Sequence, residues 1–98
     1  MTYELKVRKE AEQDISLIFE YYEEIIDGLG HDFLLCVEEA FSKIERNPLN
    51  YRKTYKELRR VIISRFPYRV FYFIKESTII VTAVFHAQKD PESWQNRT

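Results

Sequence analysis

The chain has 98 residues but only one cysteine, two glycines, three prolines and two histidines. A single cysteine excludes an intramolecular disulfide, and its place in the apolar run FLLCV predicts that Cys36 is a small buried hydrophobe. A lone cysteine also fits a reducing compartment. The two histidines, His31 and His86, fall on separate segments and no cysteine pair accompanies them, so we expect no metal site.

Long hydrophobic runs are missing as well. The longest unbroken apolar runs, FLLCV and VFYFI, have five residues each, whereas a membrane-spanning helix needs about 18. The first 15 residues carry seven charges and lack the apolar centre of a secretory signal. We therefore expect a cytoplasmic protein without a membrane partner and without a cofactor.

Charge is abundant but unevenly divided along the chain, although the net charge is only −1. Residues 1–50 hold 5 Lys and Arg against 12 Asp and Glu, which gives −7. Residues 51–98 hold 10 Lys and Arg against 4 Asp and Glu, which gives +6. Such asymmetry indicates an anionic partner for the second half, or mutual attraction of the two halves across the fold.

Hydropathy patterns divide the first half into a strand and two helices. Residues 3–8 alternate apolar and polar side chains, which predicts a half-buried strand. Apolar residues then recur at helical spacing over residues 9–27, with Gly28 as the expected C-cap, and again over residues 31–46. Because the link between the helices is short, we expect an antiparallel helical hairpin.

The second half returns to a period of two. Residues 48–57 are polar and predict a loop, after which LRRVIISRF, YRVFYFI and TIIVTAVFH read as three strands joined by short connections. Short connections favour an antiparallel meander, and the mostly apolar last strand suits a central position. The tail from residue 87 is expected to be irregular or to form one short helical turn.

The order β-α-α-β-β-β predicts an α+β fold in one domain, residues 1–98, with the helical hairpin packed on one face of an antiparallel sheet. The other face is then open, or covered by the tail or by a partner. One strand register turns four side chains toward that face, with two lysines from the loop at its rim: Arg60, Ser64, Arg69 and His86, then Lys53 and Lys56. Arginine forks match phosphate oxygens, and such a surface also suits an acidic protein segment.

Common enzymatic signatures are absent, including the phosphate-binding loop and the zinc-protease helix motif. An ordered set of short motifs is present instead. It comprises A-x-x-D-I-x-x-I-x-x-Y (11–21), Phe33, N-P (47–48), R-R (59–60), R-F-P-Y-R-V-F-Y (65–72), His86, D-P-x-x-W (90–94) and Arg97. In this order the motifs resemble, from end to end, the ParE branch of the ParE/RelE toxins of bacterial type II toxin–antitoxin systems.

The resemblance implies a small toxin that is silenced by a cognate antitoxin, and it allows a hetero-oligomer of the two. RelE-like members cut mRNA on the ribosome without a metal, whereas some ParE-like members poison DNA gyrase. Nuclease candidates here are Arg60, Arg69, His86 and Lys89. The RelE-like arginine after the last strand is replaced by the run Ala87-Gln88-Lys89, and the tail aromatic, Trp94, has no ionisable hydroxyl.

These departures favour the ParE-like, non-nuclease reading, so no residue is assigned as catalytic. A ribosome-dependent endoribonuclease and a non-toxic module that only binds an antitoxin remain the alternatives. We expect the antitoxin to add a strand to a free sheet edge, such as residues 3–8, or to lay a helix into an apolar groove. The residues expected to bind a partner or target are Lys53, Lys56, Arg59, Arg60, Arg65, Arg69, His86, Trp94 and Arg97.

Overall fold

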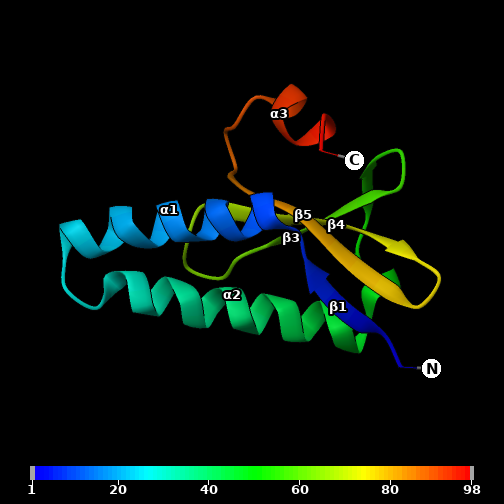
Figure 1. Ribbon diagram of the computed structural model, residues 1–98, viewed down its shortest axis with the longest axis horizontal. Coiled ribbons are helices and arrows are strands. Elements are labelled where there is room, and N and C mark those ends of the chain that lie inside the picture. The colour runs from blue at the N-terminus through cyan, green and yellow to red at the C-terminus, as the bar shows by residue number, and fades with distance from the viewer. Residues whose placement is uncertain (1, 98) are drawn as a thin grey trace.

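The structure is a computed structural model that describes residues 2–97 in two main layers, a helical hairpin and a sheet. Figure 1 shows the two long helices side by side, with a short third helix, α3, standing apart from them near the C-terminus. The elements are β1 (Glu4–Val7), α1 (Lys9–Ile25), α2 (Leu29–Arg46), the 3₁₀ turn η1 (Pro48–Asn50), β2 (Lys53–Tyr55), β3 (Leu58–Ile62), β4 (Tyr68–Lys75), β5 (Thr78–His86) and α3 (Pro91–Gln95).

The helical hairpin forms where the sequence predicts it, and its turn depends on both glycines. Gly28 has a φ of 92°, a left-handed conformation that favours glycine, and it is the N-cap of α2, whereas the C-cap of α1 is Ile26 and not Gly28 as expected. A Cβ on Gly30 would lie 2.6 Å from the carbonyl oxygen of Phe19. The lack of side chains at these two positions therefore lets the helices turn and approach closely.

The side chain of Glu23, on α1, stabilises the same turn by hydrogen bonds to its backbone. One carboxylate oxygen accepts the backbone N–H of Gly30 at 2.8 Å, and the other accepts that of Gly28 at 3.2 Å. The first turn of a helix has N–H groups without helical partners, so this carboxylate serves as a cap for α2 supplied by α1. The hydrogen bond from Gly28 is the main cause that lowers the pKa of Glu23 below its ordinary value of 4.5.

We expect Glu23→Gln to lower the melting temperature at pH 7, because the amide has a single acceptor oxygen and is neutral, so one backbone N–H loses its acceptor and the other hydrogen bond is weaker. A carboxyl group with a lowered folded-state pKa contributes stability that is complete above pH 4.5 and is lost as the pH falls through the folded-state pKa. The difference between wild type and variant should therefore shrink in thermal melts below pH 4.5. Glu24→Gln, on the exposed neighbour, is the matched control and should change the melting temperature little.

The sheet has the order β1-β5-β4-β3-β2. Strands β3, β4 and β5 form the expected antiparallel meander, β4 and β5 are internal, and β1 is an edge. The α+β prediction with a helical hairpin on one face is confirmed, but the sheet is mixed because β1 pairs in parallel with β5. The two helices separate β1 from the later strands, so no short connection fixed its direction.

Residues 48–57, expected to be a loop, contain η1 and the three-residue strand β2. The hydroxyl of Tyr72, a fully buried residue of β4, donates a 2.6 Å hydrogen bond to the carbonyl oxygen of Pro48. Burial is the main cause that raises the pKa of Tyr72, so the hydroxyl stays a donor at physiological pH. This bond attaches the segment after α2 to the centre of the sheet.

Replacing Tyr72 by Phe should lower the free energy of unfolding by about 1–3 kcal/mol, because a buried carbonyl loses its partner. Chemical denaturation measured by circular dichroism tests this. Tyr21→Phe removes a hydroxyl from a side chain that is 58% exposed, and should change the same quantity by less than about 0.5 kcal/mol. Equal effects of the two substitutions would contradict the assigned role of the Tyr72 bond.

A β-bulge in β5 decides which of its side chains share a face. Phe71 pairs with Ala83 but the next residue, Tyr72, pairs with Val81, so Thr82 is an extra residue. Its hydroxyl donates to the carbonyl oxygen of Phe71 at 3.4 Å, and its side chain is fully buried. After the bulge, the two faces exchange: Val84 lies on the same face as Ile79 and Val81, and Ala83 lies on the opposite face.

Each face of the sheet carries its own apolar cluster. The face under α1 and α2 holds the main core, which includes Phe33, Ile44, Val70, Tyr72, Ile79 and Val81. The opposite face, here called the outer face, holds a smaller cluster of Leu58, Phe71, Ala83 and Trp94. Trp94 of α3 stacks on Phe71 with ring centroids 4.7 Å apart, so the tail covers part of this face.

Candidate interaction face of the sheet

The outer face carries two arginines that no described carboxylate neutralises. Arg60 of β3 pairs across from Phe71, and Arg69 of β4 pairs across from Ile62 on one side and Phe85 on the other. Arg60 and Arg69 are therefore diagonal neighbours on one face, a spacing that long side chains bridge. Within residues 2–97 all ion pairs involve other groups. The sequence-based expectation of an outward-facing cationic pair is confirmed for these two residues.

Arg69 is held partly inside the protein. Its Nε atom is buried and has no hydrogen-bond partner within the described part of the chain. A guanidinium has five N–H donors and no acceptor, so the Nε of Arg69 lacks the hydrogen bond that a buried donor normally makes. A ligand with an acceptor oxygen on this face would satisfy donors that the protein itself leaves open.

His86 does not join these arginines, so the expected grouping of Arg60, Ser64, Arg69 and His86 is wrong. His86 pairs across from Tyr68, which belongs to the helix-covered core, and its ring meets the Tyr68 ring at 5.2 Å. The physical reason is the bulge at Thr82, which reverses the last four residues of β5. Ser64 lies beyond the end of β3, in the turn before β4.

Of the two lysines expected at the rim of the outer face, Lys56 lines a hollow on that face, whereas Lys53 pairs across from Arg59, whose own partner Tyr72 lies on the helix-covered side. The Lys53 ammonium lies 3.1 Å from the Glu57 carboxylate, and the Lys56 ammonium lies 5.2 Å from the Tyr55 ring centroid. Lys56 has a φ of 51°, the left-handed conformation of a tight turn.

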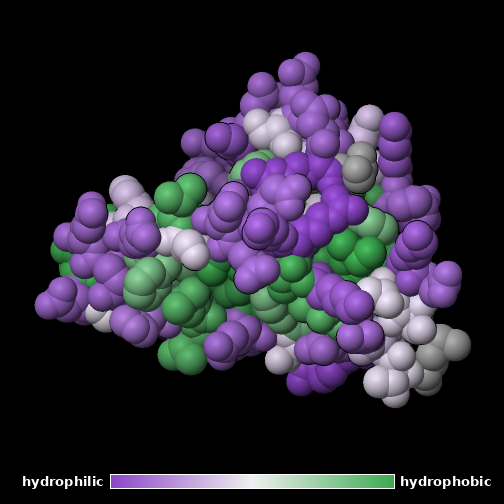
Figure 2. All heavy atoms as spheres, viewed as in Figure 1, coloured by the Kyte–Doolittle hydropathy of each residue, from purple (hydrophilic) through white to green (hydrophobic). Residues whose placement is uncertain are grey.

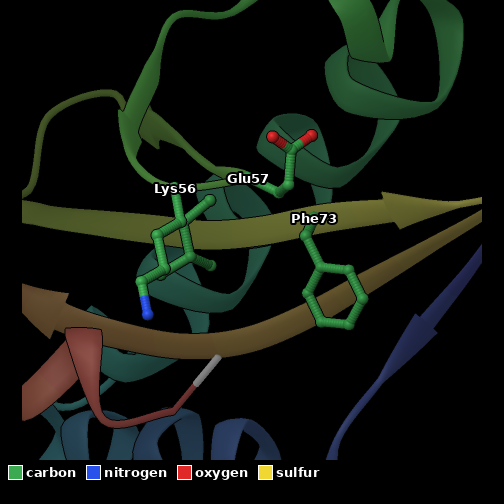
Figure 3. A pocket seen from close by; sticks show the side chains of 4 residues that line it. Lys56, Glu57 and Phe73 are labelled. Carbon is green, nitrogen blue, oxygen red and sulfur yellow. The ribbon is translucent and has the colours of Figure 1, made fainter.

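A hollow of about 210 Å³ opens beside them, lined by Lys56, Glu57, Leu58 and Phe73. Figure 3 shows the Lys56 chain and the Phe73 ring extending in the same direction, and the Glu57 carboxylate pointing the other way. The lining is almost wholly apolar, since Leu58 and Phe73 both belong to the outer-face cluster. This hollow can receive an apolar side chain with a cation at its rim.

Arg59 and Arg65, which the sequence grouped with the binding residues, occupy different settings. The Arg59 guanidinium donates to the backbone carbonyl oxygens of Leu49, within η1, and of Tyr51, directly after it, and so it holds this turn against β3. Arg65 is exposed in the β3–β4 turn with a φ of 72°. Arg59 therefore has a structural role, whereas Arg65 is accessible to a partner.

Arg97 forms the shortest ion pair among the described residues. Its guanidinium donates to both carboxylate oxygens of Asp14, at 2.6 and 3.2 Å, and lies 4.6 Å from the Phe85 ring centroid. Asp14 also accepts the backbone N–H of Val84 at 3.0 Å. Arg97, like the stacked Trp94, thus fixes the tail to the body of the protein.

Sequence reasoning missed two members of this arrangement. Asp14 follows Ala11 by three residues and precedes Ile18 by four, so it lies on the buried stripe of α1, and an acid at that position was the available signal. Arg8 follows Glu4 and Lys6 at a period of two, which places it on the outer face. Its guanidinium lies 5.3 Å from the Phe73 ring centroid and donates to the carbonyl oxygen of Arg97.

Arg97→Ala should lower the free energy of unfolding by about 1–3 kcal/mol, because it leaves the mostly buried Asp14 carboxylate without its cation. Denaturant melts provide the measurement. Arg46→Ala, at an exposed end of α2, is the matched control with an expected change below about 0.5 kcal/mol. If Arg97→Ala reduced the biological effect of the protein and left its stability unchanged, Arg97 would belong to the binding surface instead.

The helical hairpin offers a second, apolar surface. Five of its large hydrophobic side chains are more than half exposed: Leu17, Tyr21, Ile25, Ile26 and Leu35. Leu17, Tyr21 and Ile25 follow one another at four-residue spacing on α1, so they form a stripe. Figure 2 shows hydrophobic atoms gathered along the hairpin, with hydrophilic atoms over the region of α3.

Two kinds of site have no basis in the described residues. Within residues 2–97, no three His, Cys, Asp or Glu side chains cluster so that they could hold a metal ion. None of the described helices is both long enough and apolar enough to cross a membrane.

Burial raises the pKa of Tyr22 to about 12, so this tyrosine, on the helix-covered side, is not a base at neutral pH.

Two comparisons with known protein sequences both identify ParE toxins as relatives of this chain. A family model described as the ParE toxin of the type II toxin–antitoxin system parDE matches residues 5–91. Toxin ParE2 of Mycobacterium tuberculosis is 27% identical over 94 residues, which cover 95% of this chain and 90% of that protein.

Two solved structures share the fold. A chain of the chromosomal ParDE toxin–antitoxin system from P. aeruginosa aligns with a TM-score of 0.78 and 15% identity, over 87% of this chain and 96% of that one. A free-state arginine-to-alanine mutant of the E. coli toxin RelE aligns with a TM-score of 0.72 and 15% identity, over 99% of this chain and 95% of that one.

Proposed function

The chain belongs to the family of ParE toxins of type II toxin–antitoxin systems, and from that membership we propose that it inhibits DNA gyrase by protein–protein contact. The outer face, with Arg60 and Arg69 unpaired beside an apolar hollow, is the surface that meets the target. No bond is made or broken there. The chain acts in the cytoplasm in this proposal.

The observation that carries this proposal over RNA cleavage is the separation of His86 from the arginine pair. Metal-free cleavage of RNA needs a group that moves protons beside the cations that stabilise the phosphorane. The bulge turns His86 to the helix side, and the aromatic residue stacked on the outer face is Trp94, which has no ionisable hydroxyl. The arginines are therefore better suited to recognition than to catalysis.

A cognate antitoxin is the second proposed partner. The exposed apolar stripe of α1, with Leu17, Tyr21 and Ile25, fits the apolar face of an amphipathic helix. Glu20 and Glu24, which are exposed, directly precede Tyr21 and Ile25 on α1, so acidic residues flank the stripe. The antitoxin segment that covers the hairpin is thus expected to carry basic residues around its apolar side chains.

Purified chain should inhibit supercoiling of relaxed plasmid by DNA gyrase. Reversing both outer-face charges, Arg60→Glu with Arg69→Glu, should weaken the inhibition about tenfold or more, because two positive charges are lost from the contact surface. Lys9→Glu with Arg46→Glu makes the same change of charge on the helices and is the matched control, with inhibition retained. Circular dichroism confirms that both variants are folded.

Two results would contradict the proposal. Supercoiling that stays unaffected while ribosome-bound mRNA is cut would establish the endoribonuclease alternative. Unchanged bacterial growth during soluble expression of the chain alone, with neither activity in vitro, would leave only the non-toxic antitoxin-binding module.

A further inference from the structure

Strand β1 covers only the first part of β5, and a hollow opens where this cover ends. The two strands pair as far as Val81, and the rest of β5 lies beside α1. The hollow measures about 260 Å³, just below the roughly 300–1,000 Å³ of sites for drug-sized ligands, so a small molecule fits it. Its apolar lining comes from α1 and the end of β5: Leu17, Ile18, Val84 and Phe85. The Leu17 side chain is 67% exposed, so the hollow is open to solvent.

Two polar residues of the lining are positioned by the turn that follows β5. His86 and Lys89 both line the hollow. The backbone N–H of Lys89 donates to the carbonyl oxygen of His86 at 2.9 Å, and that of Gln88 donates to the His86 Nδ1 at 3.0 Å. The N–H of Ala87 donates to the carbonyl oxygen of Pro67 at 2.8 Å. The turn is therefore fixed by hydrogen bonds of the protein itself.

These two residues offer hydrogen-bond donors. Because the Nδ1 of His86 accepts a hydrogen bond, the proton of its neutral imidazole lies on Nε2, which can donate to a ligand. The Lys89 ammonium lies 5.5 Å from the Phe85 ring centroid and has no carboxylate within ion-pair distance in residues 2–97. The N–H of Val84 is directed away from β4, toward Asp14, and alternate residues of a strand share a direction, so the N–H of His86 points to the same side.

The carboxylate of Asp14, which also lines the hollow, is already occupied. Its Oδ2 accepts the N–H of Val84 and one N–H of the Arg97 guanidinium, and its Oδ1 accepts another from Arg97. Asp14 and Arg97 neutralise each other, so the Lys89 ammonium is the uncompensated charge of the lining. A cationic ligand would meet a like charge and no free carboxylate, whereas an anion gains charge-assisted hydrogen bonds.

We propose that this hollow binds a small carboxylic acid with an apolar body. The carboxylate accepts hydrogen bonds from Lys89 and His86, and the apolar body lies against Leu17 and Phe85. A phosphate fits less well, because it carries about −1.5 to −2 charges at pH 7 and the lining supplies one uncompensated cation. The C-terminal residue of a peptide, where its side chain is apolar, has the same chemistry as a free acid, and the experiment below separates the two sources.

This site is independent of the proposed function. It shares no lining residue with the outer-face arginines, Arg60 and Arg69, or with the hollow beside Phe73. Failure of either proposal therefore leaves the other standing. Leu17 also belongs to the exposed stripe of α1, so a bound acid and the antitoxin would compete for this side chain, and binding is measured on the chain alone.

The test titrates the full chain, labelled with ¹⁵N, with phenylacetate. Amide shifts should centre on Leu17, Phe85 and Lys89, with a dissociation constant on the order of millimolar for so small a ligand. Phenylacetamide keeps the ring but is neutral, and it should bind about tenfold more weakly. Acetate lacks the apolar body, so it should give no saturable shift, and it controls for ionic strength.

A peptide arm identifies the source of the acid. N-acetyl-glycyl-phenylalanine presents the same ring beside a C-terminal carboxylate, and its C-terminal amide is the matched control. Tighter binding of this peptide acid than of phenylacetate would assign the site to a chain terminus, and the reverse order would assign it to a free acid. In either case the amide should bind about tenfold more weakly than the peptide acid.

Protein variants test the same contacts. Lys89→Gln should weaken phenylacetate binding about tenfold, whereas Lys75→Gln makes the same change of charge at an exposed position of β4 and should leave binding unchanged. Leu17→Glu should abolish saturable binding, because it brings a negative charge beside the carboxylate. Leu49→Glu places that charge on another exposed leucine and is its control. Circular dichroism establishes that the variants are folded.

Three results would overturn the proposal. The first is the absence of any saturable shift at about 20 mM phenylacetate, well above the dissociation constant expected for a ligand of this size. The second is a set of shifts centred on Lys56 and Phe73, which line the other apolar hollow. The third is equal affinity for phenylacetate and phenylacetamide, because the hollow would then not recognise an anion. These readouts use the wild-type chain, so they stand even if a variant does not fold.

Discussion

One extra residue in β5 determines the arrangement of both faces of the sheet. The parallel pairing of β1 with β5 ends at Val81, whose carbonyl oxygen accepts a hydrogen bond from the N–H of Arg8. Thr82 then bulges, and the N–H of Val84 is accepted by the Asp14 carboxylate from α1. Because Asp14 also binds Arg97, the group that satisfies the end of β5 is the group that fixes the C-terminal tail. The strand, the helix and the tail are thus joined at one carboxylate.

The tail in turn limits the outer face. Trp94 stacks on Phe71, and Arg97 and Lys89 lie against the Phe85 ring at 4.6 and 5.5 Å. The aromatic residues of β4 and β5 on this face are therefore partly covered, whereas Arg60, Arg69 and the hollow beside Phe73 stay open. The open part of the outer face thus lies on the β2–β3 side, where Lys56 lines the hollow (Figure 3).

Periodicity was enough to predict the helical hairpin, the β3–β4–β5 meander and the edge position of β1, since these follow from local spacing and short connections. The parallel direction of β1 and the bulge at Thr82 could not be predicted, because both depend on pairing between distant segments. The site was affected in the same way. Arg60 and Arg69 precede the bulge and were placed correctly relative to each other, whereas His86 follows it and was not. Arg59 and Arg97 were interpreted as surface cations because only the folded structure shows that their acceptors, the Tyr51 carbonyl and the Asp14 carboxylate, lie beside them.

The uneven charge of the two halves had two explanations, attraction between the halves or a partner for the basic half. The ion pairs of the described residues bear on the first explanation. Glu23 with His31, Glu39 with Lys43 and Lys53 with Glu57 each lie within one half, and only Asp14 with Arg97 joins the two. If mutual attraction accounted for the asymmetry, most of the basic residues would face helix carboxylates across the fold. Arg52, Arg60 and Arg69 have no such contact, and they lie on a face and an edge of the sheet that the acidic helices do not cover. Much of the charge of the second half is therefore not neutralised by the acidic helices, which favours the second explanation, a partner for the basic half.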